Sequence, residues 1–89
     1  MTAILTVIGK DKVGIIASVS AVLSQLNINI LDINQTVMKE YFTMIMLVDI
    51  SAANAGFDEI KRGLKLLSDE IGLEIRIQRD EIFNSMHRI

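Results

Sequence analysis

The spacing of apolar residues changes several times along the chain, and each spacing predicts a different element. Residues 3–8 form a short apolar run, rich in β-branched side chains and ended by Gly9, which predicts a strand buried on both faces. From Gly14 to Leu26 the apolar positions follow helical spacing and predict a first helix: Ile15, Ile16, Val19, Val22, Leu23 and Leu26. The segment Asn27-Ile28-Asn29 then ends this helix.

The opposite face of the first helix carries small uncharged residues, namely Ala17, Ser18, Ser20, Ala21 and Ser24. A helix face in contact with water usually carries lysine and glutamate instead. We therefore expect a second surface to pack against this face.

Two adjacent segments predict a hairpin. In residues 30–38 the polar Asp32, Asn34 and Thr36 alternate with apolar residues, so one face of this strand is wet or faces a ligand. Lys39-Glu40 predicts a tight turn into a strand over 41–50. That strand is apolar on both faces, with one side made of Phe42, Met44, Met46 and Val48 and the other of Tyr41, Ile45 and Leu47.

A second helix and a last strand complete the pattern. The helix carries acidic residues in its first turn, ends at Gly72 and has an apolar stripe of Phe57, Ile60, Leu64, Leu67 and Ile71. Gly63 lies beside this stripe, which predicts a close approach to the first helix. Residues 73–78 alternate strictly and predict an edge strand, and the tail that follows is expected to form a short helix.

The predicted order, β-α-β-β-α-β, favours an α+β fold of the ferredoxin-like type. With right-handed crossovers, two β-α-β halves interleave into a four-stranded antiparallel sheet with both helices on one face. The first and third strands are then central, and their apolar pattern predicts that a partner covers part of the helix-free face. We expect a single domain over residues 1–89, with 80–89 as its C-terminal tail.

Composition excludes several classes of protein. The chain is 51% hydrophobic and 22% charged, and no apolar run approaches the ~18–20 residues that span a bilayer. A net charge of −2 gives no electrostatic footprint for nucleic acid or anionic membrane. No basic region precedes the N-terminal apolar stretch, so we expect no secretory signal and a cytoplasmic location.

Residues suited to catalysis are scarce. The chain has no cysteine, and its one histidine, His87, has no nucleophile placed near it by the sequence. No spacing typical of metal ligands occurs. An RNA-binding sheet stacks bases on aromatic residues of its central strands, but here the first strand has none and the third has only Tyr41 and Phe42, at its start. We expect no catalytic residue, no metal and no cofactor; an enzyme that uses His87 at a cleft between subunits is the distant alternative.

The turn over residues 9–14 is the remaining candidate for chemistry. Gly14 opens the first helix, where the free N–H groups of the first turn and the positive helix end can receive a carboxylate. Asp11 can pair with an ammonium group, so together they suit the zwitterionic head of an amino acid. The structural alternative is that Asp11 caps the helix and that Gly14 supplies a positive φ.

Three stretches of the chain resemble a known module, the ACT domain, a small ligand-binding unit of amino-acid-regulated enzymes and of regulators. They are Gly9-Lys10-Asp11-Lys12-Val13-Gly14-Ile15-Ile16, Leu23 to Leu26, and residues 29–36. Residues 35–38, 41–44 and 82–89 are similar to the free-standing bacterial and archaeal ACT proteins labelled UPF0237. That family is related to the ACT domains of the glycine cleavage system transcriptional repressor.

The resemblance implies a homodimer that holds an amino acid where the turn of one subunit meets the start of the second strand of its neighbour. Matched by position, the implied ligand-binding residues are Asp11, Gly14, Ile15, Asn29 and Ile30. Many amino-acid-binding members have Asn at the position of Asp11 and Pro at that of Val13, so the resemblance does not carry over a particular amino acid.

These observations predict a regulatory domain, not an enzyme, that binds a small molecule at a dimer interface and signals to an unidentified protein partner. The alternative is a protein-interaction module that has kept the dimer surface and binds no ligand.

Overall fold

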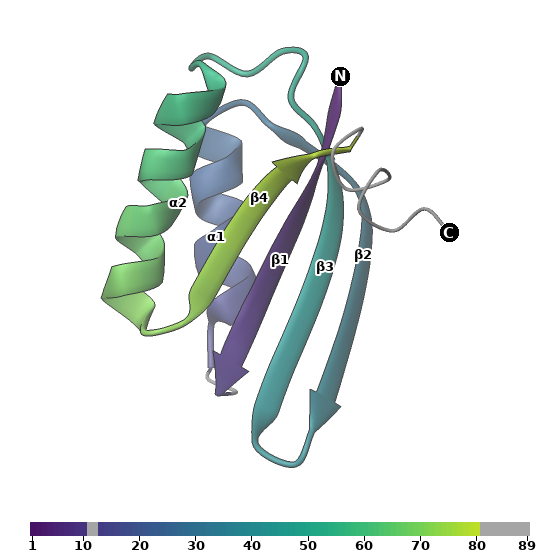
Figure 1. The fold of residues 1–89 in the computed structure, drawn as a ribbon, viewed down its shortest axis with the longest axis vertical. Coiled ribbons are helices and arrows are strands. Elements are labelled where there is room, and N and C mark those ends of the chain that lie inside the picture. The colour runs from purple at the N-terminus through teal and green to yellow at the C-terminus, as the bar shows by residue number, and fades with distance from the viewer. Residues whose placement is uncertain (11–12, 81–89) are drawn as a thin grey trace.

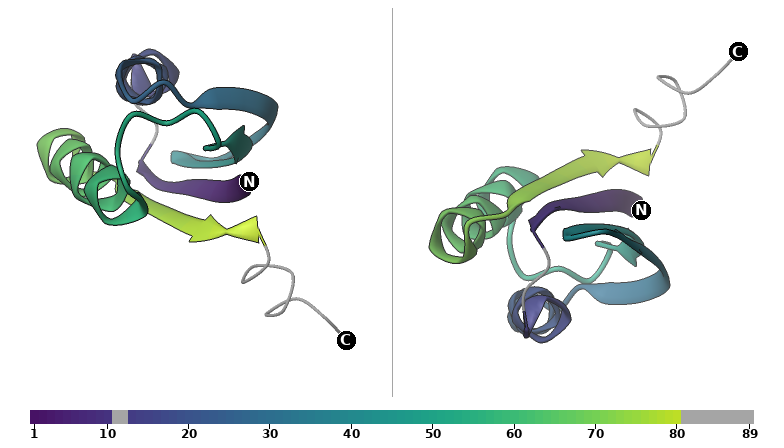
Figure 2. Two further views of the ribbon diagram at one scale, coloured as in Figure 1. Left: turned by 90° about the horizontal axis from the view of Figure 1, so that it is seen from above. Right: turned by 90° about the horizontal axis from the view of Figure 1, so that it is seen from below.

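In the computed structural model, one antiparallel sheet is covered on a single face by two helices (Figures 1 and 2). The structure describes residues 1–10 and 13–80. The elements, in chain order, are β1 (Thr2–Lys10), α1 (Ile15–Gln25), β2 (Asn29–Met38), β3 (Tyr41–Asp49), α2 (Phe57–Ile71) and β4 (Glu74–Arg79). The predicted ferredoxin-like βαββαβ fold is confirmed.

The strands lie in the order β2-β3-β1-β4, so β1 and β3 are central and β2 and β4 are the edges. The core fills the layer between the sheet and the helices. Its fully buried members include Leu5 and Val7 of β1, Met44, Met46 and Val48 of β3, Val19 and Leu23 of α1, and Ile60 and Leu64 of α2. Both central strands therefore direct their alternate residues to the same apolar layer.

The two faces of the central strands differ in burial. Phe42, Met44, Met46 and Val48 are all buried, whereas Ile45, which the alternation placed on the other side of β3, is 42% exposed. In β1 the prediction of burial on both faces holds for Ile4, at 9% exposed, but is wrong for Ile8, at 46%. The reason is that both helices lie on the same face and leave the second face of β1 uncovered by them.

Three helix boundaries depend on left-handed backbone. Gly14 precedes α1 with a φ of 86°, and Gly72 follows α2 with a φ of 70°. Asn27, with a φ of 58°, ends α1 in the same region. Glycine and asparagine tolerate this conformation better than other residues, so these ends are fixed by local backbone preference.

Gly63 does not have the role that its position suggested. A Cβ atom built at this residue would meet nothing within 4 Å, so no close approach of α1 requires a glycine there. The prediction of close helix packing at Gly63 is wrong, because α2 reaches the sheet through the side chains of Ile60, Leu64 and Leu67.

The hairpin formed by β2 and β3 extends past the end of α1 (Figure 1). Its two-residue connection is the predicted Lys39-Glu40, with Lys39 in the left-handed region at a φ of 57°. The end of β2 that extends past the helices has no helix on either face. This explains the high exposure of Val37 and Met38, at 53% and 70%.

Candidate ligand-binding site

Gly14 and Ile15 lie at the N-terminal end of α1. The first helical hydrogen bond runs from the Ser18 N–H to the Gly14 carbonyl oxygen, at 2.9 Å. The N–H groups of residues 15–17 precede that bond, and among the described residues no side chain caps them. Backbone donors and the positive end of the helix dipole therefore face outward here, which favours an anionic group.

Two hollows lined entirely by described residues adjoin this helix end. The larger, about 300 Å³, lies between α1 and the hairpin and is lined by Gly14, Ile15, Ile16, Ala17, Gln35, Val37 and Phe42. The smaller, about 150 Å³, lies toward the end of α2 and is lined by Val13, Gly14, Ile15, Ser18 and Ile71. Gln35 is the one side chain with an amide in the larger hollow, and the rest of that lining is apolar.

Asn29 and Ile30 line a separate cavity at the other end of α1. Its volume is about 480 Å³, and its walls are Ser20, Leu23, Ser24, Asn27, Ile28, Asn29, Ile30 and Ala52. Binding sites for small molecules commonly measure roughly 300–1,000 Å³, so the size suits a small ligand. Its polar lining is made of hydroxyl and amide groups and contains no charged side chain.

Hydrogen bonds hold the wall of this cavity in place. The Asn27 side chain donates from Nδ2 to the Ala52 carbonyl oxygen at 2.8 Å. Asn54 donates twice to the end of α1, from Nδ2 to the Gln25 oxygen at 3.0 Å and from its backbone N–H to the Leu26 oxygen at 3.1 Å. The loop after β3 thus caps the last carbonyls of α1 and fixes the cavity between them.

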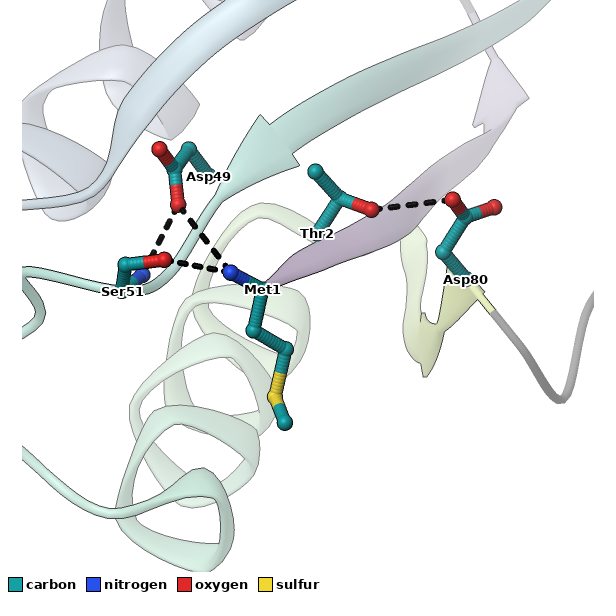
Figure 3. A network of polar contacts seen from close by, with 5 residues as sticks. All are labelled: Met1, Thr2, Asp49, Ser51 and Asp80. Atoms are coloured by element: carbon teal, nitrogen blue, oxygen red, sulfur yellow. Dashed lines mark hydrogen bonds and ion pairs between the residues drawn. The ribbon is translucent and has the colours of Figure 1, made fainter.

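A second polar network anchors the start of that loop (Figure 3). The Ser51 N–H donates to Asp49 Oδ1 at 2.9 Å, and the Met1 ammonium lies 3.8 Å from the same oxygen and donates to the Ser51 hydroxyl. The backbone hydrogen bond from Ser51 is the main cause that lowers the pKa of the Asp49 carboxyl. Thr2 donates to Asp80 at 2.9 Å, which ties β1 to the end of β4.

Within one chain the predicted site residues form two groups that do not meet. Gly14 and Ile15 are at one end of α1, and Asn29 and Ile30 are at the other, about 16 Å away for a helix of 11 residues. Asp11 lies outside the described residues. The free edge strand β2 runs from the cavity at Asn29 to the hollow at Gln35 and Val37.

The sequence reasoning did not assign Ser20, Ser24, Asn27 or Gln35 to the site, although each lines one of these spaces. The signal for two of them was present, because Ser20 and Ser24 belong to the small uncharged face of α1. For Asn27 the sequence predicts only the end of the helix. Gln35 gave no signal of its own, because a glutamine on an edge strand is common on a solvated surface.

Two other kinds of site, a metal centre and a membrane-spanning helix, were also considered for the described residues. In residues 1–10 and 13–80 no three His, Cys, Asp or Glu side chains gather as a metal site would require. Within the same ranges no helix has the length and apolarity to cross a membrane.

The fold places the chain among the ferredoxin-like α+β domains, and comparison with known proteins narrows this class. The chain belongs to the ACT domain family, whose model matches residues 1–78. It is 57% identical to a UPF0237 protein of Clostridium acetobutylicum over 89 residues, with both chains covered completely. The predicted resemblance is therefore confirmed.

Solved structures agree with this assignment. An ACT domain protein from Streptococcus pneumoniae superposes with a TM-score of 0.82 at 42% identity, covering 93% of each chain. A candidate glycine cleavage system transcriptional repressor gives 0.75 at 26% identity, covering 86% of this chain and 44% of that one. The regulatory subunit of aspartate kinase from Thermus thermophilus gives 0.69 at 27% identity, covering 89% and 51%.

Proposed function

We propose that this chain is a non-enzymatic regulatory domain that binds an amino acid between two copies of itself and passes the signal to a partner protein. One observation carries the proposal: the predicted site residues lie at opposite ends of α1, with a free edge strand running between them. A site assembled from two chains can bring both groups of predicted residues to one ligand, whereas a site within one chain cannot.

The edge strand β2 offers the way to assemble such a site. Exposed edge strands pair readily with a second chain, and a two-fold axis near the middle of β2 pairs two copies antiparallel. The start of one strand then lies beside the end of the other. The cavity at Ile30 of one chain adjoins the hollow at Val37 of its partner, so the dimer forms two equivalent composite sites.

The groups in the two halves suit a zwitterion. The N–H groups at the start of α1 receive the carboxylate, and the hydroxyl and amide oxygens of Ser20, Ser24 and Asn29 accept hydrogen bonds from the ammonium. Asp11 supplies the negative charge for that ammonium in our proposal. Ile15 and Ile30 offer apolar contact to a small side chain.

Regulation follows from linkage between ligand and assembly. A ligand that touches both chains has a higher affinity for the paired state and stabilises it by that difference. Two similar proteins, a candidate glycine cleavage system transcriptional repressor and the regulatory subunit of aspartate kinase, support a regulatory role. A partner protein that recognises only one dimer geometry therefore binds to an extent that depends on the ligand concentration.

Thermal melts against each amino acid at millimolar concentration test this function. A ligand at about 100 times its Kd adds about 2.7 kcal/mol, and a domain of this size gains about 4–8 °C in Tm per kcal/mol. We expect a clear rise with one or a few amino acids. Asn29→Ala removes the rise, whereas the control variant Glu70→Ala, at an exposed position of α2 outside both hollows and away from β2, keeps it. No rise with any amino acid contradicts the proposal.

A ligand-free interaction module is the second candidate, because Ile8, Ile45 and Tyr41 expose 46%, 42% and 53% of their surface on the helix-free face. In that case Asp11→Ala and Asn29→Ala leave partner binding intact, and substitutions on the sheet face abolish it. Pull-down of the partner with these variants separates the two candidates.

A further inference from the structure

Gln35 interrupts an apolar stripe on the side of β2 that faces α1. This side continues the buried face of β3, because its residues pair with core residues of that strand: Ile30 with Val48, Ile33 with Met46, Gln35 with Met44 and Val37 with Phe42. Gln35 is the only one of the four β2 residues with a polar side chain. The register therefore places an amide where the rest of the stripe is hydrocarbon.

The Gln35 side chain lines the larger hollow at the start of α1, together with Gly14, Ile15 and Ala17. Among residues 1–10 and 13–80, none forms a hydrogen bond with its amide. The other side chains that line this hollow are apolar. When a second chain covers the edge of the sheet, an amide that is closed off from water without a partner becomes unfavourable. A ligand that hydrogen-bonds to Gln35 removes this cost.

Neither half of the composite site offers a charge to the side chain of a ligand. The walls of the cavity at Asn29 and of the hollow at Gln35 contain no acidic or basic side chain. In the proposed function, the ligand carboxylate binds the N–H groups of α1 and the ammonium binds Asp11. A further charge on the ligand side chain would be enclosed between two chains without a partner, which is strongly unfavourable. Acidic and basic amino acids are therefore poor ligands.

The amide of Gln35 distinguishes among the uncharged amino acids. Its oxygen accepts hydrogen bonds and its nitrogen donates them. Hydroxyl and amide side chains also donate and accept, so they can use both groups, whereas a hydrocarbon side chain leaves both without a partner. A site built to hydrogen-bond a ligand group rejects the analogue that lacks the group far more strongly than an apolar pocket rejects a smaller ligand. Polar uncharged side chains are therefore favoured.

We propose that the ligand is an amino acid whose side chain carries a hydroxyl or an amide group, and that Gln35 is the residue that selects it. The class consists of serine, threonine, asparagine and glutamine. This inference rests on the proposed function, because it takes the carboxylate at the start of α1 as given. The ligand side chain then lies in the same hollow, where Ile15 contacts its carbon atoms and Gln35 binds its polar group.

Isothermal titration calorimetry of the wild-type chain with matched pairs of amino acids tests the class. Serine and alanine differ by one hydroxyl group, and asparagine and aspartate have nearly the same shape but differ in charge. We expect serine or asparagine to bind roughly 5- to 150-fold more tightly than its counterpart, the ratio for one enclosed polar group left unpaired. Equal affinities within the pairs, or tighter binding of alanine or aspartate, overturn this inference.

Gln35→Leu tests the role of Gln35 itself, because it replaces the amide with a hydrocarbon group of similar size at an exposed position. We expect the ratio of serine to alanine affinity to fall to about one. Glu70→Leu, at an exposed position of α2 outside both spaces, is the control and keeps the wild-type ratio. A ratio that is unchanged in Gln35→Leu contradicts the selection by Gln35. The ligand pairs still test the class on the wild-type chain if this variant fails to fold.

Failure of this inference differs from failure of the proposed function. If no amino acid releases or takes up heat and none raises Tm, the proposed function is contradicted, and this inference with it. If an acidic, basic or hydrocarbon side chain gives the tightest ligand, a shared site stands and the selection by Gln35 is wrong. If the second chain satisfies the amide instead, Gln35→Leu weakens the dimer without ligand and leaves the ligand ratio unchanged, which also overturns the selection.

Discussion

Gly14 and Asn29 lie at opposite ends of one helix, α1, with 11 helical residues between them. Each adjoins its own space, and no described side chain joins the two. The helix acts as a rigid spacer, and β2 follows the same direction along the edge of the sheet. Because of this separation, a site that contains both residues requires two chains.

Gly14 is needed for its backbone conformation. Its φ of 86° is unfavourable for a residue with a side chain, although a Cβ atom there would meet nothing within 4 Å. We expect Gly14→Ala to lower the free energy of unfolding by about 1–2 kcal/mol. Urea denaturation measures it, and an unchanged midpoint contradicts the assignment.

Gly63 provides the opposite case in the same protein. It lies inside α2 with ordinary helical geometry and open space beside it. We expect Gly63→Ala to raise the free energy of unfolding by about 0.5–1 kcal/mol, because alanine loses less conformational entropy on folding. A loss of stability would instead reveal a close contact at this position.

Gly9 is required by packing. A Cβ atom at Gly9 would lie 2.2 Å from Leu73 Cδ2, and Leu73 is buried with 4% exposure. We expect Gly9→Ala to cost about 1–3 kcal/mol in the wild-type chain. In a Leu73→Ala background, whose own cost is about 2–5 kcal/mol, the same change should be nearly neutral. Equal costs in both backgrounds would show that this contact is not the cause.

Asn27 combines a left-handed conformation with the hydrogen bond to Ala52 that forms the cavity wall. Asn27→Gly keeps the backbone and loses the bond, for which we expect a loss of about 1 kcal/mol. Asn27→Ala loses both and should cost about 2–3 kcal/mol. Chemical denaturation of the two variants measures the difference, and equal losses would rule out a backbone contribution.

The lowered pKa of Asp49 predicts a pH dependence. Hydrogen bonds from Ser51 favour the carboxylate in the folded state, so the unfolded state takes up this proton at higher pH than the folded state does. The stabilisation is complete above the unfolded pKa, about 3.9, and is lost as the pH falls through the lower folded pKa. We expect Asp49→Asn to lower Tm at pH 6–7 and the gap to close in strong acid. A gap that is constant with pH would contradict this.

The sequence predicted the elements well because each has a strong local cause. Alternation along β3 separated Phe42 and Met44 from Tyr41 and Ile45, and Gly72 marked the end of α2. The errors concern how the elements pack against one another. Ile8 is exposed because both helices lie on one face, and Gly63 has open space because side chains elsewhere on α2 set its distance from the sheet.

The ligand-binding residues remain a prediction, and the structure shows only where they lie. The resemblance named Gly14, Ile15, Asn29 and Ile30, and each of them does line a cavity or hollow. The distance between the two groups could not be read from the sequence, since it depends on the direction of α1 along the sheet. Asn27 and Gln35 acquire their places through the turn and the hairpin, which bring distant segments together.

Cross-linking between single-cysteine variants tests the composite site most directly, because the chain has no native cysteine. A mixture of Ile30→Cys and Val37→Cys chains, treated with a short bis-maleimide, should yield the mixed dimer. Neither variant alone should cross-link efficiently, because the like positions lie roughly 20 Å or more apart in an antiparallel β2 pair. Cross-linking in each variant alone and none in the mixture would contradict a site shared between two chains.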